Sequence, residues 1–124
     1  MIVSCHGYPI IQRFGGLAKK ASDFSVLIYQ TFSESKDYGF KDQIQRASLY
    51  IMNNIAEGYG RRSDKALMNF LTIARGSAAE VESMILMAHQ LQYINLLTQN
   101  ELLTQAEEVA KLLTGFINKI SSDN

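Results

Sequence analysis

The stretch Asn53–Ser63, NNIAEGYGRRS, places two glycines in a part of the chain that otherwise contains few helix breakers. Apolar residues recur at three- and four-residue steps on both sides of it, which is the period of an amphipathic helix. We expect one helix to end near Gly58 in a left-handed conformation, and Gly60 to complete a turn. Ser63 or Asp64 is expected to cap the next helix. The stretch is therefore predicted to be the turn of a helical hairpin at the centre of the fold.

Helical periodicity continues on both sides of this turn. Residues 17–33 and 40–58 each carry one apolar stripe, and they are separated by turn-forming residues. After the turn, four apolar residues repeat every seven positions: Leu67, Ala74, Val81 and Ala88. Such a repeat is close to coiled-coil packing and predicts a long third helix.

A fourth helix is predicted near the C-terminus. Thr98 and Glu101 have the spacing of a capping-box pair, and an apolar stripe follows from Leu102 to Ile120. Amphipathic helices joined by short loops favour antiparallel neighbours that share one core. The sequence therefore predicts an all-α fold, an antiparallel up-down-up-down four-helix bundle.

Composition limits the possible classes of protein. The 124 residues suit one domain, 1–124, of which residues 1–13 are expected to form an N-terminal arm. Twelve basic and twelve acidic side chains cancel, so the chain lacks the overall positive field of a generic nucleic-acid binder, while a local basic patch stays open. Cys5 is the single cysteine, which excludes an intramolecular disulfide and fits a reducing cytoplasm. No apolar run approaches the roughly 20 residues of a membrane span, so we expect no membrane association.

The glycine-arginine turn precedes a helix N-terminus, where free N–H groups favour anions. Its spacing matches neither a P-loop nor a dinucleotide-binding motif. Arg61, Arg62 and Lys65 are therefore candidates for nucleic-acid contact, and a solvated turn is the competing interpretation. Neither His89 nor the pair Cys5 and His6 has the partners of a metal site. We expect no metal, no cofactor and no catalytic residue, since Ser77 lacks an acid–base relay.

Other polar residues are candidates for setting the register of the hairpin or for an interface. If the turn centres near Gly60 and Arg61, Arg46 lies level with Arg75 and can reach toward Glu80, one turn along. Asn54 then lies near Met68 or Asn69, and the small residues 76–79 allow another helix to approach closely. Glu57 lies some 15 Å along the axis from the Arg75 level, so it needs Arg61, Lys65 or a neighbouring subunit as its partner. The candidate register or interface residues are Arg46, Asn54, Glu57, Arg75 and Glu80.

Three runs in the centre of the chain resemble the bacterial four-helix bundle family named after 23S rRNA intervening sequences. They are QIQRA at 43–47, NIAEGYGRRS at 54–63 and FLTIARGSAAEVE at 70–82. The chain departs from the family pattern before Leu17 and at Met52, where a proline is common. The family is similar to accessory proteins of diversity-generating retroelements, which are basic, form five-fold barrels and bind nucleic acid and a reverse transcriptase. The resemblance implies a homopentamer, and it implies no catalytic residues.

These observations lead us to expect a non-enzymatic homo-oligomeric scaffold or adaptor, associated with RNA or with a nucleic-acid-processing protein. The alternative is a helical nuclease or nucleotide-handling enzyme with an intersubunit site built from Glu57, Arg46 and Arg75. A third interpretation is a purely structural assembly module whose partner protein carries the function.

Overall fold

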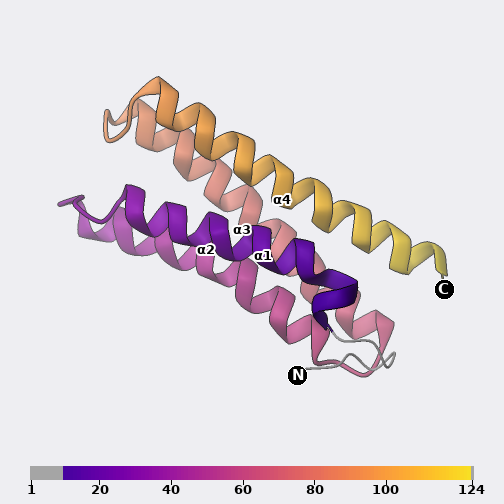
Figure 1. Ribbon diagram of the computed structural model, residues 1–124. Coiled ribbons are helices and arrows are strands. Elements are labelled where there is room, and N and C mark those ends of the chain that lie inside the picture. Colours follow the sequence, from indigo (N-terminus) through magenta and orange to yellow (C-terminus); the bar gives the residue numbers. More distant parts are fainter. Residues whose placement is uncertain (1–9, 124) are drawn as a thin grey trace.

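The computed structural model describes residues 10–123, with side chains from Gly16 to Ser122. These residues form four helices: α1 (Ile10–Thr31), α2 (Tyr38–Tyr59), α3 (Asp64–Gln90) and α4 (Leu96–Asp123). Successive helices run in opposite directions (Figure 1). The predicted all-α, up-down-up-down four-helix bundle is confirmed. Within the described residues, no helix combines the length and the apolar character needed to cross a membrane.

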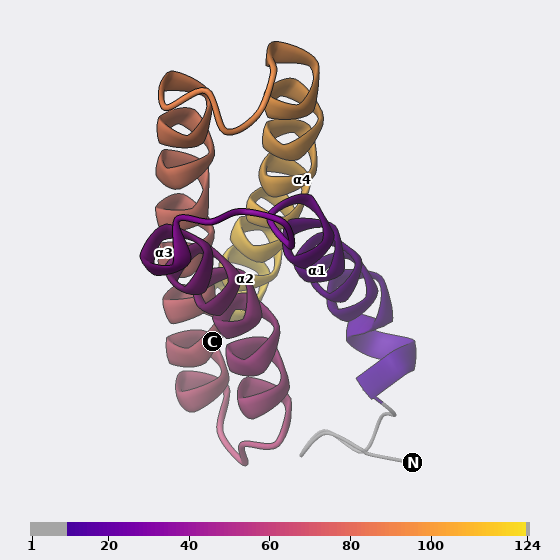
Figure 2. The same cartoon turned by 90° about the vertical axis from the view of Figure 1, so that its left-hand side faces the viewer.

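The helices pack around one core as the corners of a square. Each helix contacts the next one in the chain, and α4 returns to contact α1. Figure 2 shows α1 and α3 on opposite sides of the bundle, with α2 and α4 between them. The predicted seven-residue repeat of α3 faces the core, because all four of its members are buried: Leu67, Ala74, Val81 and Ala88. Fully burying one large apolar side chain contributes about 1.5–3 kcal/mol, so these stripes account for the association of the helices.

The first helix begins earlier than its apolar stripe indicates. Ile10 is its first residue, so residues 10–13 belong to α1 and the predicted arm is wrong for them. Residues 1–9 of that arm lie outside the described residues. Gly15 and Gly16 lower helix propensity but do not remove a backbone hydrogen-bond donor as proline does, so the helix continues through them.

The start of α4 also differs from the prediction. Asn95, and not Thr98, supplies the cap: its Oδ1 accepts a 2.8 Å hydrogen bond from the Thr98 backbone N–H. Helix α4 therefore begins at Leu96, and the predicted capping box of Thr98 and Glu101 is wrong. An asparagine oxygen serves a helix N-terminus as well as a threonine oxygen does, so sequence spacing alone left two equivalent solutions.

Helix α3 ends next to a residue with a left-handed backbone conformation that the sequence did not predict. Gln92 has φ 65°, in the left-handed region that favours glycine. The Gln92 N–H donates to the His89 carbonyl at 2.9 Å, and the Tyr93 N–H donates to the Ala88 carbonyl at 2.9 Å. This is the Schellman pattern, which satisfies carbonyl groups at the helix end.

Candidate functional site

The α2–α3 turn is built differently from the prediction. Gly58 does not end α2 in a left-handed conformation; it lies inside the helix, which continues to Tyr59. A Cβ at Gly58 would lie 3.0 Å from Leu67 Cδ1 and 3.1 Å from Phe70 Cβ. Glycine is therefore required here by the close approach of α3. Gly60 follows as the C-cap with φ −82°, a right-handed conformation.

The chain reverses in the four residues from Gly60 to Ser63. The Arg61 N–H donates to the Gly58 carbonyl at 3.1 Å, which closes the end of α2. Ser63 caps α3, because its Oγ accepts a 3.1 Å hydrogen bond from the Ala66 N–H. Ser63, one of the two predicted caps, is thus confirmed. Tyr59 places its side chain in the core, and burial raises the pKa of its hydroxyl.

Arg61 is held by two neighbours. Its guanidinium forms a 2.9 Å ion pair with Glu57, one turn earlier, and its Cζ lies 4.7 Å from the centre of the Phe70 ring. The sequence left three possible partners for Glu57, and in the structure its partner is Arg61. Both side chains of the pair are about half exposed, at 47% and 60%, so the pair itself adds little stability. Its effect is to orient Arg61 along the turn.

Arg62 and Lys65 are the remaining cations of the turn. Both are exposed, and neither forms an ion pair with a described residue. They flank Ser63 at the N-terminus of α3, where the helix dipole also favours negative charge. Among the described residues, the turn therefore presents two cations without an ion-pair partner, and a third, Arg61, whose charge is partly balanced by Glu57.

The hairpin packs Gly58 against Leu67 and Phe70, and it brings Arg46 and Glu80 to one hollow between α2 and α3. The shared hollow fits the predicted reach of Arg46 toward Glu80. The level of Arg46 relative to Arg75 stays a prediction.

A shallow hollow of about 340 Å³ lies between α2 and α3 on their outer side. Arg46, Tyr50 and Glu80 line it. Arg46 pairs with Asp42, one turn earlier, at 3.1 Å. Asn54 donates to the Tyr50 carbonyl at 2.8 Å. Both interactions are local to α2, so neither of them joins α2 to α3.

Arg75 points away from this hollow. Its guanidinium donates to Thr114 Oγ1 of α4 at 3.5 Å. Arg46 lies on the side of α2 that faces α3, so the two arginines serve different pairs of helices. Within one chain, Glu57, Arg46 and Arg75 do not converge on a common point. The described residues also contain no group of three or more His, Cys, Asp or Glu that could hold a metal ion.

The outer side of the α2–α3 pair carries several exposed apolar side chains. Ile73 and Met87 are 52% and 50% exposed, and Tyr50 and Leu91 are nearly as accessible. On α3, the positions 73, 80, 84, 87 and 91 follow at three-, four- and seven-residue steps, so they form one stripe beside the hollow. We call these residues, with Arg46 and Tyr50 of α2, the α2–α3 outer face. Gly76 lies beside it, and nothing comes within 4 Å of a Cβ built there, so the predicted close approach of another helix is not met within the described chain.

Comparisons with known proteins agree with this architecture. No curated protein matches the chain significantly. A crystal structure of a protein with unknown function from the S23 ribosomal protein family of Bacteroides thetaiotaomicron is similar, with a TM-score of 0.77 and 28% sequence identity, over 82% of this chain and 97% of that one. The profile of the 23S rRNA-intervening sequence proteins matches residues 16–115, which include all three motif runs. The chain therefore belongs to the 23S rRNA-intervening sequence protein family.

Proposed function

We propose that this protein is a non-enzymatic scaffold that assembles with copies of itself through the α2–α3 outer face and carries RNA or a nucleic-acid-processing protein. The observation that carries the proposal is the apolar stripe of α3 beside the hollow. Exposed apolar side chains along one helix face, bordered by polar groups, are typical of protein–protein interfaces. The family resemblance implies five copies in the assembly.

The composition of the outer face suits an interface between identical subunits. Its apolar members, Ile73 and Met87, are each about half exposed in the isolated chain. Arg46 and Glu80 contribute opposite charges at the border of the hollow. Apolar side chains with charged groups at the rim are the usual anatomy of such interfaces.

The nucleic-acid part of the proposal rests on the α2–α3 turn. Arg62 and Lys65 are exposed and form no ion pair with a described residue. In an oligomer these two cations repeat once per subunit, and a multivalent array binds a polyanion more tightly than one pair does. The likeness to accessory proteins of diversity-generating retroelements, which bind nucleic acid, is an expectation from the sequence and is part of the same proposal.

The alternative, a nuclease or nucleotide-handling enzyme, receives less support. Glu57 is paired with Arg61, Arg46 with Asp42, and Arg75 reaches toward α4. A general acid–base site needs its groups within reach of one reacting atom. The proposed scaffold requires no such convergence.

The assembly is tested by sedimentation of the wild-type protein and of a double variant, Ile73→Glu with Met87→Glu. We expect the wild type to sediment as an oligomer and the double variant as a folded monomer. Leu86→Glu is the matched control, because Leu86 is 48% exposed on the same helix but lies on the side turned away from α2. A monomeric wild type, or equal effects of the control and the double variant, would refute assembly through this face.

The nucleic-acid part is tested by titrating a structured RNA at low and moderate salt. We expect Arg62→Ala with Lys65→Ala to weaken RNA binding and to reduce its salt dependence. With fewer phosphate contacts, binding releases fewer counterions from the RNA. Lys111→Ala on α4 removes an exposed lysine far from the turn and serves as the control. If oligomeric wild-type protein leaves the RNA unshifted even at low salt, the scaffold proposal stands without RNA.

A further inference from the structure

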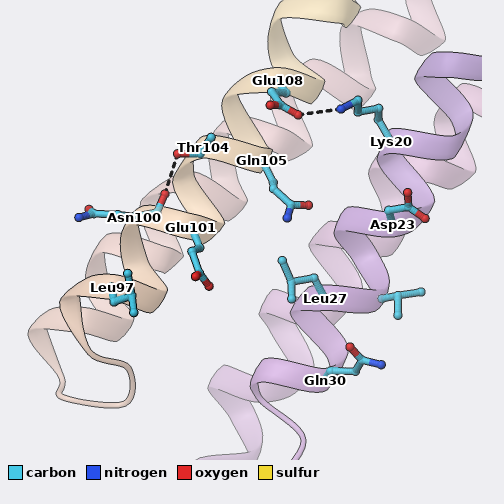
Figure 3. Close-up of a pocket in the computed structure, with 11 residues that line it drawn as sticks. Lys20, Asp23, Leu27, Gln30, Leu97, Asn100, Glu101, Thr104, Gln105 and Glu108 are labelled. Carbon is cyan, nitrogen blue, oxygen red and sulfur yellow. Dashed lines mark hydrogen bonds and ion pairs between the residues drawn. The ribbon is translucent and has the colours of Figure 1, made fainter.

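A groove separates α1 from α4 on the side of the bundle opposite the α2–α3 outer face. Its volume is about 940 Å³, and α1 and α4 are the least extensively packed of the neighbouring helices. In Figure 3, the Lys20–Glu108 ion pair joins the two helices at one end, and Gln30 and Leu97 lie at the other, wider end. We call this space the α1–α4 groove.

The walls of the groove are two straight helical stripes. On α1 they run from Lys20 to Gln30, and on α4 from Leu97 to Glu108. At about 1.5 Å per residue, each wall is some 15 Å long, which matches about three turns of a helix laid between them. Antiparallel helices that diverge in this way leave room for a further helix that packs on both.

Apolar side chains are accessible inside the groove. Leu27 packs against the core and also lines the groove floor. Val26 and Leu97 are 52% and 69% exposed. An amphipathic helix presents apolar residues at three- and four-residue spacing. Its apolar face would be buried against Val26, Leu27 and Leu97.

The charged groups of the groove are mostly acidic. Three carboxylates line it, those of Asp23, Glu101 and Glu108, against the single ammonium of Lys20. Lys20 is engaged by Glu108 at 2.9 Å, and Asp23 by Lys19 at 3.1 Å. Glu101 forms no ion pair with any described residue, and Figure 3 shows its side chain directed into the space between the helices. Within the part of the chain that the structure describes, the groove thus offers a carboxylate without an ion-pair partner beside apolar side chains.

We propose that the α1–α4 groove binds a basic amphipathic helix of a partner protein. The apolar face of that helix contacts Val26, Leu27 and Leu97, and a lysine or arginine of the partner pairs with Glu101. Because the groove and the α2–α3 outer face lie on opposite sides, one subunit can engage a partner and a neighbouring copy at once. The inference names the kind of partner that the proposed scaffold carries and rests on that role, but its geometry does not depend on self-assembly.

The test uses three labelled peptides and measures fluorescence anisotropy with the full chain. The first is a helical peptide of leucine and lysine with an amphipathic pattern, the second has every lysine replaced by glutamate, and the third has the first peptide's composition in an order without an apolar stripe. We expect saturable binding of the first peptide only. Equal binding of the first and third peptides would show simple charge attraction and would overturn the proposal.

Variants of the protein locate the binding site. Glu101→Lys is expected to weaken binding of the first peptide about three- to tenfold, since a surface ion pair is replaced by repulsion. Leu97→Ser is expected to weaken it as well. Glu107→Lys is the matched control, because Glu107 is an exposed carboxylate on the same helix that does not line the groove, and it is expected to leave peptide binding unchanged. Equal effects of Glu101→Lys and Glu107→Lys would place the peptide elsewhere.

Two further readouts separate this proposal from the assembly of the scaffold. Amide chemical-shift changes on adding the first peptide are expected along residues 20–30 and 97–108, and changes confined to α2 and α3 would contradict the proposal. Sedimentation of Glu101→Lys is expected to match that of the wild type. A loss of oligomer in this variant would mean that another copy of the chain occupies the groove, which also overturns the proposal.

Discussion

The hydroxyl of Tyr93 donates a 2.6 Å hydrogen bond to Oδ2 of Asp37 and so connects the two loops at one end of the bundle. The other oxygen of Asp37 accepts from the Phe40 N–H at 3.1 Å and caps α2. The rings of Phe40 and Tyr93 meet edge to face, with centroids 5.4 Å apart. One carboxylate therefore caps a helix and holds the α3–α4 loop against it.

We predict that Tyr93→Phe lowers the Tm, because it removes the hydroxyl and leaves the ring contact in place. The bond to Tyr93 is the main cause that lowers the pKa of Asp37, and the same bond raises the pKa of Tyr93. The stabilisation from Asp37 is present above its ordinary pKa of 3.8 and is lost as the pH falls through the lower value in the fold. The stabilisation from Tyr93 is present below pH 10.0, its ordinary pKa, and is lost as the pH rises through the raised pKa of Tyr93 in the fold.

Thermal unfolding at several pH values checks this prediction. The Tm difference between wild type and Tyr93→Phe should be largest in the neutral range and should shrink toward both extremes. Tyr38→Phe is the control, because Tyr38 is 72% exposed at the start of α2. A difference that does not vary with pH would mean that the hydroxyl acts without the carboxylate.

A second prediction concerns the close contact at Gly58. Gly58→Ala should destabilise the protein by about 1–3 kcal/mol, the usual cost of adding a methyl group to a packed site. The added Cβ would lie 3.0 Å from Leu67 Cδ1 and 3.1 Å from Phe70 Cβ, and the Phe70 Cβ is attached directly to the backbone of α3, so it cannot move aside easily.

Gly115→Ala in α4 is the matched control, since nothing lies within 4 Å of a Cβ there. That change should stabilise the protein by about 0.5–1 kcal/mol, because alanine has the higher helix propensity. Urea unfolding measures both variants. Stabilisation by both would show that α2 and α3 do not approach as closely as the contacts indicate.

Gly58 also shows what the sequence could and could not predict. The periodicity of apolar residues predicted four helices and their order, because burial of one stripe per helix decides the architecture. The same sequence did not reveal whether Gly58 serves a turn or a close helix contact, since glycine is suited to both. That distinction depends on where Leu67 and Phe70 lie in the neighbouring helix, which is a tertiary contact.

The contacts of the candidate site were likewise predicted only in part from the sequence. The pairing of Glu57 with Arg61 joins residues four apart on successive turns, and the sequence included it among three choices. The contact of Arg75 with Thr114 joins residues from different helices and was not anticipated. The α1–α4 groove was not anticipated either, because it arises from the divergence of two helices and not from a motif.

A third prediction concerns the buried hydroxyl pair Ser25 and Ser48, whose oxygens are 3.1 Å apart between α1 and α2. Ser48 donates to the Gln45 carbonyl at 2.8 Å, so Ser25 must be the donor to Ser48. Ser48→Ala should cost about 1–3 kcal/mol, since it leaves the Ser25 hydroxyl buried without its acceptor.

Ser25→Ala should cost less, because Ser48 keeps its bond to Gln45. The double variant should be less destabilised than the sum of the two single variants, and a double-mutant cycle of urea unfolding measures the difference. Additive effects would show that the two hydroxyls do not depend on each other.

The last prediction concerns Glu82 on α3, whose pKa is raised by partial burial and, to a smaller extent, by Glu107 on α4. A carboxylate with a raised pKa in the fold destabilises the protein above its ordinary pKa of 4.5, and this cost disappears as the pH falls to that value. Glu82→Gln should therefore raise the Tm at neutral pH and have little effect near pH 4. Glu34→Gln in the α1–α2 loop, where the side chain is exposed, is the control and should leave the Tm nearly unchanged. If Glu82→Gln lowers the Tm at neutral pH, the carboxylate has a favourable role, and the cost inferred from its burial and from Glu107 is wrong.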